Sequence, residues 1–200
     1  MILSTLSRAH KTELVRKALH LLVAFTVPLA GWNRGVCLTL LSGGTLFYCG
    51  AETLRTRGRS IPLVSRLTRI ASRSRDEGHF VLGPVTLGLG ALGGILCFPP
   101  AIAAAAVYAL AFGDTAASIG GSLFGVFRPR FLRGKSVEGT LASFVTVYTV
   151  VWALRFGVIP ALAAALLSVV VDILPMGDYD NLALPLAIGL ALRLYCEYAP

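Results

Sequence analysis

The chain has 200 residues, of which 56% are hydrophobic, 14% are charged and 21 are glycine. Because an ordinary soluble domain carries about 25% charged residues, this composition excludes a soluble globular protein and a disordered chain, and it indicates an integral membrane protein. The net charge of +8 then bears on topology and on attraction to anionic lipids. Nucleic-acid binding is not expected, because no soluble basic domain is long enough to carry it.

Seven apolar stretches are candidates for transmembrane helices, each of which needs about 20 mostly apolar residues. They lie at residues 19–32, 35–54, 80–98, 101–124, 140–154, 158–173 and 182–195. The first, fifth and last are short, so tilting or extension into their polar flanks is implied. The sequence therefore predicts an all-α polytopic membrane protein with about seven transmembrane helices in a single transmembrane domain, residues 1–200.

The distribution of lysine and arginine predicts the orientation of these spans. Four cations precede residue 18, seven arginines lie between residues 55 and 75, and four cations lie between residues 128 and 135, which leaves only Arg34, Arg155 and Arg193 elsewhere. Positive charge favours the cytoplasmic side. We therefore expect a cytoplasmic lead (1–18), a cytoplasmic basic loop (55–79) and a cytoplasmic loop (125–139). The protein would be integral to the cell membrane, with its N-terminus and its site on the cytoplasmic side and its C-terminus on the external side.

The basic loop contains a candidate interfacial helix. From Pro62 onward apolar residues recur at helical spacing, while arginines share the other side, and Ser60 is the expected N-cap. The apolar residues are Leu63, Val64, Leu67, Ile70 and Ala71, and the arginines are Arg66, Arg69 and Arg73. The pattern predicts a basic amphipathic helix on the inner leaflet. Two roles stay open: an anchor to anionic lipid, and closure over a phosphate-bearing ligand.

Asp114 is the one acidic residue inside a predicted span that has a glycine-lined helix face beside it. A charge in hydrocarbon is costly unless it has a partner or a function. At helical spacing Asp114 shares a face with Ser118, Gly121 and Gly125, which places a carboxylate and a hydroxyl beside a strip of bare backbone. Packing of neighbouring helices explains the two glycines equally well, but it does not explain the aspartate.

Lys135 and Ser136 follow in a Gly-Lys-Ser sequence that fails the phosphate-loop pattern, because Pro129 stands where that loop needs glycine. A lysine at the membrane surface can bind a polyphosphate or merely extend to the headgroups, and the spacing alone does not decide between them.

Further polar residues gather next to the predicted cytoplasmic ends of the spans. Asp180 and Asn181 are good ligands for a hard cation, although residues of this kind also cap helices. The N-terminal group contains Arg16, Lys17 and His20 together with Glu13, and lesser candidates for a site are Glu52, Arg55, Glu77 and Glu138.

Four short elements together resemble the CTP-dependent lipid kinase family, which contains dolichol, phytol and farnesol-type kinases and the fungal diacylglycerol kinase, and which is related to CDP-diacylglycerol synthases. The elements are RKALH (16–20), GDTAASIGGSLFG (113–125), KSVEGT (135–140) and DNLALP (180–185). The resemblance runs from about residue 16 to residue 193. Leu184 stands where the family usually has isoleucine, and the chain matches only the minimal catalytic core.

The resemblance implies transfer of a phosphoryl group from CTP to a lipid hydroxyl with Mg²⁺ or another divalent cation. Arg16, Lys17, Asp114 and Gly121 match positions on which the family's activity depends. Arg16, Lys17 and Lys135 would be catalytic cations that bind phosphate, assisted by His20, Ser118, Gly121, Gly125 and Ser136. Asp114 would hold the metal or accept the hydroxyl proton, and Asp180 with Asn181 would complete the metal site.

Two alternatives remain at this stage: a cytidylyltransferase that makes a CDP-lipid, and a transporter or lipid-binding membrane protein without turnover. The sequence does not identify the acceptor alcohol, the preference for CTP over ATP, the number of metals or the oligomeric state. The expected partners are CTP, the lipid alcohol and anionic membrane lipids.

Overall fold

The computed structural model describes residues 8–59, 61–72, 76 and 78–198, and within them it contains helices and no strand. The all-α prediction is therefore confirmed for the described part of the chain. The helices are α1 (Arg8–Ala24), α2 (Thr26–Trp32), α3 (Arg34–Thr56), α4 (Pro62–Ala71), α5 (Gly83–Cys97), α6 (Pro100–Tyr108), α7 (Asp114–Leu123), α8 (Val137–Ala153), α9 (Val158–Ile173) and α10 (Asp180–Tyr198), with a π-helical turn η3 (Ala109–Gly113) and 3₁₀ turns η4 (Arg130–Leu132) and η5 (Gly177–Tyr179).

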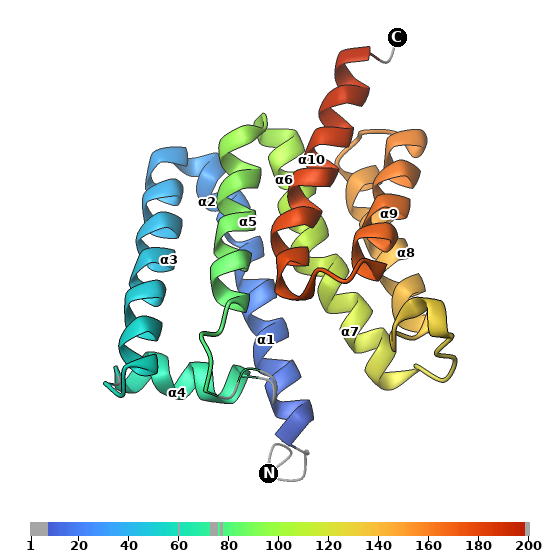
Figure 1. Ribbon diagram of the computed structural model, residues 1–200. Coiled ribbons are helices and arrows are strands. Elements are labelled where there is room, and N and C mark those ends of the chain that lie inside the picture. The colour runs from blue at the N-terminus through green and yellow to red at the C-terminus, as the bar shows by residue number, and fades with distance from the viewer. Residues whose placement is uncertain (1–7, 60, 73–75, 77, 199–200) are drawn as a thin grey trace.

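Most of the helices run along one long axis of the molecule, and the two ends of the chain lie at opposite ends of that axis (Figure 1). Helix α4 is the exception, since it lies across the end of the bundle that carries the N-terminus. It packs against α1 and α3. The loop between α7 and α8 lies toward the same end as α4 (Figure 1).

Each predicted apolar stretch corresponds to helix, and the stretch 158–173 coincides with α9. The first stretch is divided into α1 and α2 at Phe25, and the fourth contains the π-helical turn between α6 and α7. Two helical segments among the described residues, Thr12–Trp32 and Pro100–Leu123, have both the length and the apolarity to cross a membrane. The apolar helices α5, α8 and α9 are shorter, so the arrangement of seven spans stays a prediction.

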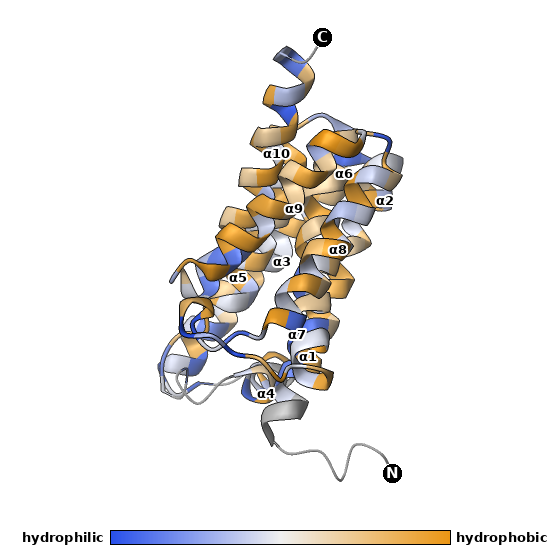
Figure 2. Ribbon diagram, turned by 90° about the vertical axis from the view of Figure 1, so that its right-hand side faces the viewer, coloured by the Kyte–Doolittle hydropathy of each residue, from blue (hydrophilic) through white to orange (hydrophobic). Residues whose placement is uncertain are grey.

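Many of the side chains in the interior of the bundle are small, although large ones are buried there too. Ala105, Ala106, Ala161, Ala164 and Ala165 are fully buried, which lets the helix backbones approach closely. A further set of large apolar side chains lies exposed along the helices, as in Leu40, Leu46 and Phe47 of α3 and Leu162, Leu166 and Val170 of α9. Figure 2 shows mainly hydrophobic residues, coloured orange, along the length of α8, α9 and α10.

Helix α4 occupies the predicted interfacial segment. Pro62 is its first residue, where the missing backbone N–H of proline costs no hydrogen bond. Arg66 and Arg69 are exposed, whereas Thr68 and Ala71 are buried. The expected N-cap Ser60 and Arg73 lie outside the described residues, and the residue that precedes the helix in the described chain is Ile61. A basic outer face is therefore present, as expected.

Candidate functional site

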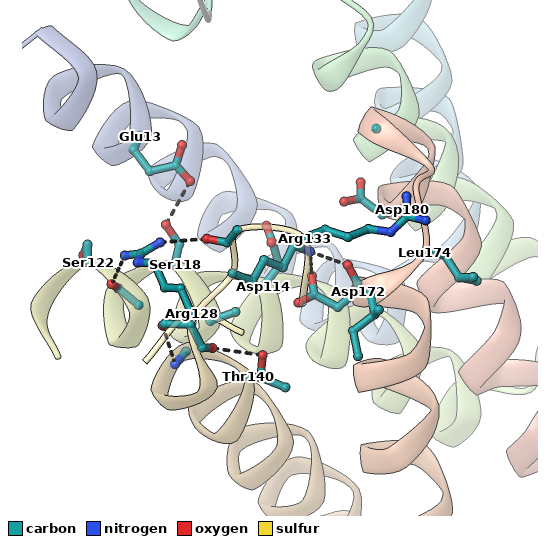
Figure 3. A pocket seen from close by; sticks show the side chains of 18 of the residues that line it. Glu13, Asp114, Ser118, Ser122, Arg128, Arg133, Thr140, Asp172, Leu174 and Asp180 are labelled. Atoms are coloured by element: carbon teal, nitrogen blue, oxygen red, sulfur yellow. Dashed lines mark hydrogen bonds and ion pairs between the residues drawn. The ribbon is translucent and has the colours of Figure 1, made fainter. Parts of the chain in front are cut away.

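A cavity of about 560 Å³ lies between α1, α7, α8, the end of α9 and the start of α10, with the loop between α7 and α8 closing one side (Figure 3). Its size is that of a small-molecule site. Its charged lining comes from distant parts of the chain. The cations are Arg16, Lys17, Arg128, Arg133 and Lys135, and the acids are Glu13, Asp114, Asp172 and Asp180.

Helix α1 contributes two cations one turn above Glu13. The Arg16 guanidinium lies 3.4 Å from the Glu13 carboxylate and 3.7 Å from that of Asp178. Lys17 Nζ lies 3.5 Å from Glu13 Oε1. Lys17 is 6% exposed, so its charge is largely desolvated, and the carboxylates beside it offset that cost. These contacts hold both cations at the cavity wall.

Asp114 begins α7 immediately after the π-helical turn η3. Lys17 Nζ donates a hydrogen bond of 2.6 Å to Asp114 Oδ2, and His20 Nδ1 lies 2.9 Å from the same oxygen. A π-helical turn inserts one residue into a helix and changes the direction of the side chains after it, and such turns are frequent at functional sites. Asp114 is thus the centre of a cluster built by α1 and α7.

Ser118 and Gly121 continue the Asp114 face of α7, as the spacing predicts. Ser118 Oγ donates to Glu13 Oε1 over 2.9 Å, which ties α7 to α1. A Cβ atom on Gly121 would lie 3.1 Å from Ser136 Oγ. Gly125 lies beyond the end of α7 at Leu123, and a Cβ atom there would lie 2.2 Å from the Gly121 carbonyl oxygen. Gly121 therefore lines the cavity, whereas Gly125 permits the turn that follows α7.

Lys135 contacts Asp172 across the cavity. Its ammonium group donates to both the carboxylate and the backbone carbonyl of Asp172, close to the C-terminal end of α9. The neighbouring Ser136 is the N-cap of α8, where its hydroxyl accepts from the Gly139 backbone N–H over 3.1 Å. Ser136 thus has a structural role as a cap and also lines the cavity.

Asp180 and Asn181 begin α10 and also line the cavity. Asp180 accepts a 2.8 Å hydrogen bond from the Asn181 backbone N–H, and it forms no ion pair with any described residue. Burial, followed by the negative charges of Asp114 and Asp172, raises the pKa of the Asp180 carboxyl above its ordinary value. The Asn181 amide donates to Thr86 Oγ1 of α5 over 3.3 Å.

Several predicted site residues do not line this cavity. His20 contacts Asp114 from a position outside the lining. Glu52 is fully buried elsewhere, where it accepts from Arg55 at 2.7 and 2.8 Å and from the Val81 backbone N–H at 2.8 Å. This pair joins the end of α3 to the chain before α5. Glu77 lies outside the described residues.

Glu138 also serves the backbone and not the cavity. Its Oε1 accepts from the Val126 and Phe127 backbone N–H groups, each at 3.2 Å. Hydrogen bonds from its own backbone N–H and from that of Phe127 hold the pKa of the Glu138 carboxyl below its ordinary value. Glu138 thereby fixes the loop that precedes it.

The donor set suits a hard divalent cation chemically, although no group of three or more His, Cys, Asp or Glu side chains among the described residues is spaced to hold one. Mg²⁺ usually binds one or two carboxylates together with substrate phosphates and water, and Asp114, Asp172 and Asp180 line one space (Figure 3). Lys17 and Lys135 pair with two of these carboxylates, whereas Asp180 forms no ion pair with any of the described residues.

Sequence reasoning did not place Asp172, Arg128, Arg133 or Glu13 among the site residues. Arg128 and Arg133 look like ordinary cytoplasmic cations in the sequence, and Asp172 ends a long apolar stretch. The i,i+4 spacing of Glu13 and Lys17 was a usable signal for their contact. No signal in the sequence pairs Lys135 with Asp172, because 37 residues separate them.

The chain matches no protein-family model, no curated protein and no solved structure.

Proposed function

We propose that the protein is an integral enzyme of the cell membrane that transfers the γ-phosphoryl group of CTP to the hydroxyl of a lipid alcohol, of the polyprenol, phytol or diacylglycerol type, at the cytoplasmic face. One observation carries this proposal. Residues from all four sequence elements, which extend from residue 16 to residue 185, line one cavity. They are Arg16 and Lys17, Asp114 with Ser118 and Gly121, Lys135 with Ser136, and Asp180 with Asn181.

Membrane placement is supported by the distribution of apolar side chains. The bundle packs fully buried alanines between its helices, and its core also holds some leucine and valine. Many other leucine, phenylalanine and valine side chains lie exposed along the helices, which is the arrangement expected for a surface that contacts lipid tails. The seven spans follow from the apolar stretches. The cytoplasmic N-terminus and the inner-leaflet position of α4 follow from the cation distribution, and all of these belong to the same proposal.

The cations of the cavity bind the triphosphate of CTP. Arg16 and Arg128 offer planar groups that match phosphate oxygens with two hydrogen bonds, whereas Lys17 and Lys135 act as point charges. The backbone of Gly121 allows close approach because it has no side chain. Each lysine is paired with a carboxylate in the free protein, so binding of phosphate exchanges one anionic partner for another.

Phosphoryl transfer needs positioned charges and no covalent nucleophile. The lipid hydroxyl oxygen forms the new bond to the γ-phosphorus while the bond from that phosphorus to the β–γ bridging oxygen breaks, and CDP leaves with the bond's electron pair. The hydroxyl proton passes to the Asp114 carboxylate if Asp114 is the base. If Asp114 is instead a metal ligand, the proton leaves through solvent.

Asp180 would hold the divalent cation, together with Asp114 if Asp114 is a metal ligand. That cation supplies charge neutralisation on the β- and γ-phosphate oxygens when it is bound. Asn181 supports this arrangement indirectly, since its amide is fixed on Thr86 and its backbone N–H orients the Asp180 carboxylate.

The decisive experiment is an assay of the purified chain in lipid vesicles with CTP, Mg²⁺ and a panel of lipid alcohols. A kinase releases CDP and forms a lipid monophosphate, whereas a cytidylyltransferase acting on phosphatidate releases pyrophosphate. Release of pyrophosphate would assign the second activity. Failure to consume nucleotide with every alcohol and with phosphatidate would leave a binding or transport protein and refute the enzymatic proposal.

The membrane orientation has its own test, which does not depend on catalysis. We expect a reporter inserted at Gly58, in the turn between α3 and α4, to be cytoplasmic, and one at Pro99, between α5 and α6, to be external. Labelling of Gly58 from outside the cell would refute the orientation.

A further inference from the structure

The loop between α7 and α8 exposes large apolar side chains next to the cavity. Phe124 is 68% exposed, Val126 88%, Phe127 63% and Phe131 69%. Two arginines of this loop, Arg128 and Arg133, line the cavity. Several exposed aromatic side chains in a loop that also lines a polar cavity are not what a loop surrounded by water presents.

The charge of the same segment has one sign. Between Leu123 and Lys135 the chain has Arg128, Arg130, Arg133 and Lys135 and no acidic residue. Aromatic side chains combined with arginine and lysine are typical of segments at a membrane interface, where rings enter the acyl boundary and cations meet anionic headgroups. The sequence alone indicates only a cytoplasmic loop for residues 125–139. The exposure of its phenylalanines adds an apolar surface to that description.

The loop is held in this form by contacts to its neighbours. Arg128 donates to the carbonyl oxygens of Gly134 at 2.8 Å and Gly121 at 3.1 Å, and the Val137 N–H donates to the Phe127 carbonyl oxygen at 2.9 Å. Glu138 accepts from the backbone N–H groups of Val126 and Phe127. Leu132, by contrast, is buried. One apolar residue of the loop is therefore used for packing, while the phenylalanines are directed outward from a fixed backbone.

We propose that residues 124–131 insert into the headgroup region of an anionic lipid surface and hold the mouth of the cavity at the depth of the acceptor hydroxyl. Phe124, Phe127 and Phe131 enter the apolar side of the interface, and Arg130 meets lipid phosphates. Insertion of the loop rests on the membrane placement of the proposed function but not on phosphoryl transfer, whereas the position of the cavity mouth at the acceptor hydroxyl rests on both.

The test uses the full chain in vesicles and requires no turnover. The native Trp32 and Trp152 are replaced by phenylalanine, and Phe127→Trp introduces one reporter. We expect strong fluorescence quenching by phosphatidylcholine that carries bromine near the headgroup end of its tails, and weak quenching by aqueous iodide. Strong iodide quenching with no effect of brominated lipid would overturn the inference.

A matched protein that keeps only Trp32 is the control. Trp32 is 77% exposed at the opposite end of the bundle and ends the first predicted span. If brominated lipid quenches Trp32 but not the tryptophan at position 127, the loop lies in water and the inference alone is wrong. If neither is quenched, the membrane placement of the proposed function fails, and the inference fails with it.

Lipid composition tests the anionic component. We expect quenching at position 127 to be stronger in vesicles that contain phosphatidylglycerol than in phosphatidylcholine alone, and we expect Arg130→Gln to reduce that difference. Arg130 is exposed and does not line the cavity, so this variant leaves the nucleotide site intact. Equal quenching in both kinds of vesicle would overturn the assignment to an anionic surface.

The triple variant Phe124→Ser/Phe127→Ser/Phe131→Ser tests the effect on the acceptor. We expect the KM for the lipid alcohol to rise roughly tenfold because the loop no longer inserts, while the KM for CTP stays unchanged. An unchanged lipid KM, or an equal rise in both constants, would refute the position of the cavity mouth at the interface.

Discussion

Replacing Asp114 by asparagine separates the structural role of this residue from its chemical role. From the sequence alone, the isosteric change should leave stability unchanged or raise it, because a buried carboxylate without a partner is costly. The structure changes that expectation. Asp114 Oδ2 lies 2.6 Å from Lys17 Nζ, and the two side chains are 24% and 7% exposed. Asp114→Asn therefore leaves a largely buried ammonium without its nearest anion.

The size of the loss follows from this geometry. Removing one partner of a buried ion pair costs about 3–5 kcal/mol. Glu13 Oε1 remains 3.5 Å from Lys17 Nζ, so we expect the lower end, about 3 kcal/mol. For a chain of this size that corresponds to a fall in melting temperature of about 6–12 °C. Thermal unfolding in detergent, followed by the fluorescence of Trp32 and Trp152, measures it.

A double-mutant cycle with Lys17→Met distinguishes lost stability from lost chemistry. We expect the double variant Lys17→Met/Asp114→Asn to recover most of the stability, because the unpaired ammonium is gone. CDP release should nevertheless stay on the order of 10²–10⁴-fold below that of the wild type, the range for loss of a general base. Weakened magnesium dependence would assign Asp114 as a metal ligand, and unchanged dependence as the base.

Glu52→Gln is the matched control for this cycle. It removes the acid of another buried ion pair, with Arg55, outside the cavity. We expect it to lower the melting temperature while CTP binding is retained. If Asp114→Asn turns over like the wild type, or if the double variant regains activity together with stability, the proposed chemical role of Asp114 is wrong.

Three further outcomes are expected. Asp172→Asn removes the carboxylate that holds Lys135. We expect the KM for CTP to rise by about tenfold, the effect of losing one charged contact, with a smaller change in kcat. An unaltered KM would contradict a role of Asp172 in positioning Lys135. Gly139→Ala places a Cβ atom 2.6 Å from the Ala117 carbonyl oxygen and should destabilise the chain by about 1–3 kcal/mol. The control Gly43→Ala, whose Cβ atom meets open space within α3, should stabilise the chain by about 0.5–1 kcal/mol. Equal melting temperatures for the two variants would refute the close contact of α7 and α8. The raised pKa of Asp180 means that the folded state holds the proton of this carboxyl to a higher pH than the unfolded chain does, so stability falls as the pH rises from the unfolded pKa to the folded pKa. Asp180→Asn should therefore raise the melting temperature at neutral pH, and the difference from the wild type should vanish below the unfolded pKa of about 3.9. A difference in melting temperature that stays constant across pH would exclude this cause.

The helices and several residues of the cavity could be predicted because both depend on local pattern. Long apolar stretches bounded by charge give helix positions to within a few residues, as 158–173 shows. The spacing of Asp114, Ser118 and Gly121 identifies a face because the periodicity of a helix is fixed. The π-helical turn before Asp114 carries no such signature, since it depends on the neighbours packed against Ala109–Gly113.

Pairings between distant helices could not be predicted, because they depend on how the helices pack. Glu52 and Arg55 form the same kind of short-range pair as Arg16 and Glu13 in the sequence, yet the first pair joins α3 to the Val81 backbone and the second lies at the cavity. Gly121 and Gly125 likewise look equivalent, although only Gly121 lines the cavity. What separates these residues is the three-dimensional position of the elements on which they lie.

The charges of the cavity constrain the ligand. The five lining cations exceed the four lining acids by one, and both lysines are held by carboxylates. A triphosphate would bring several negative charges into a space where burial, followed by the negative charges of Asp114 and Asp172, already raises the pKa of Asp180. A divalent cation entering with the triphosphate would offset these negative charges and would give Asp180 the ion-pair partner that it does not have among the described residues. Binding of nucleotide and of metal should therefore be mutually dependent in this cavity.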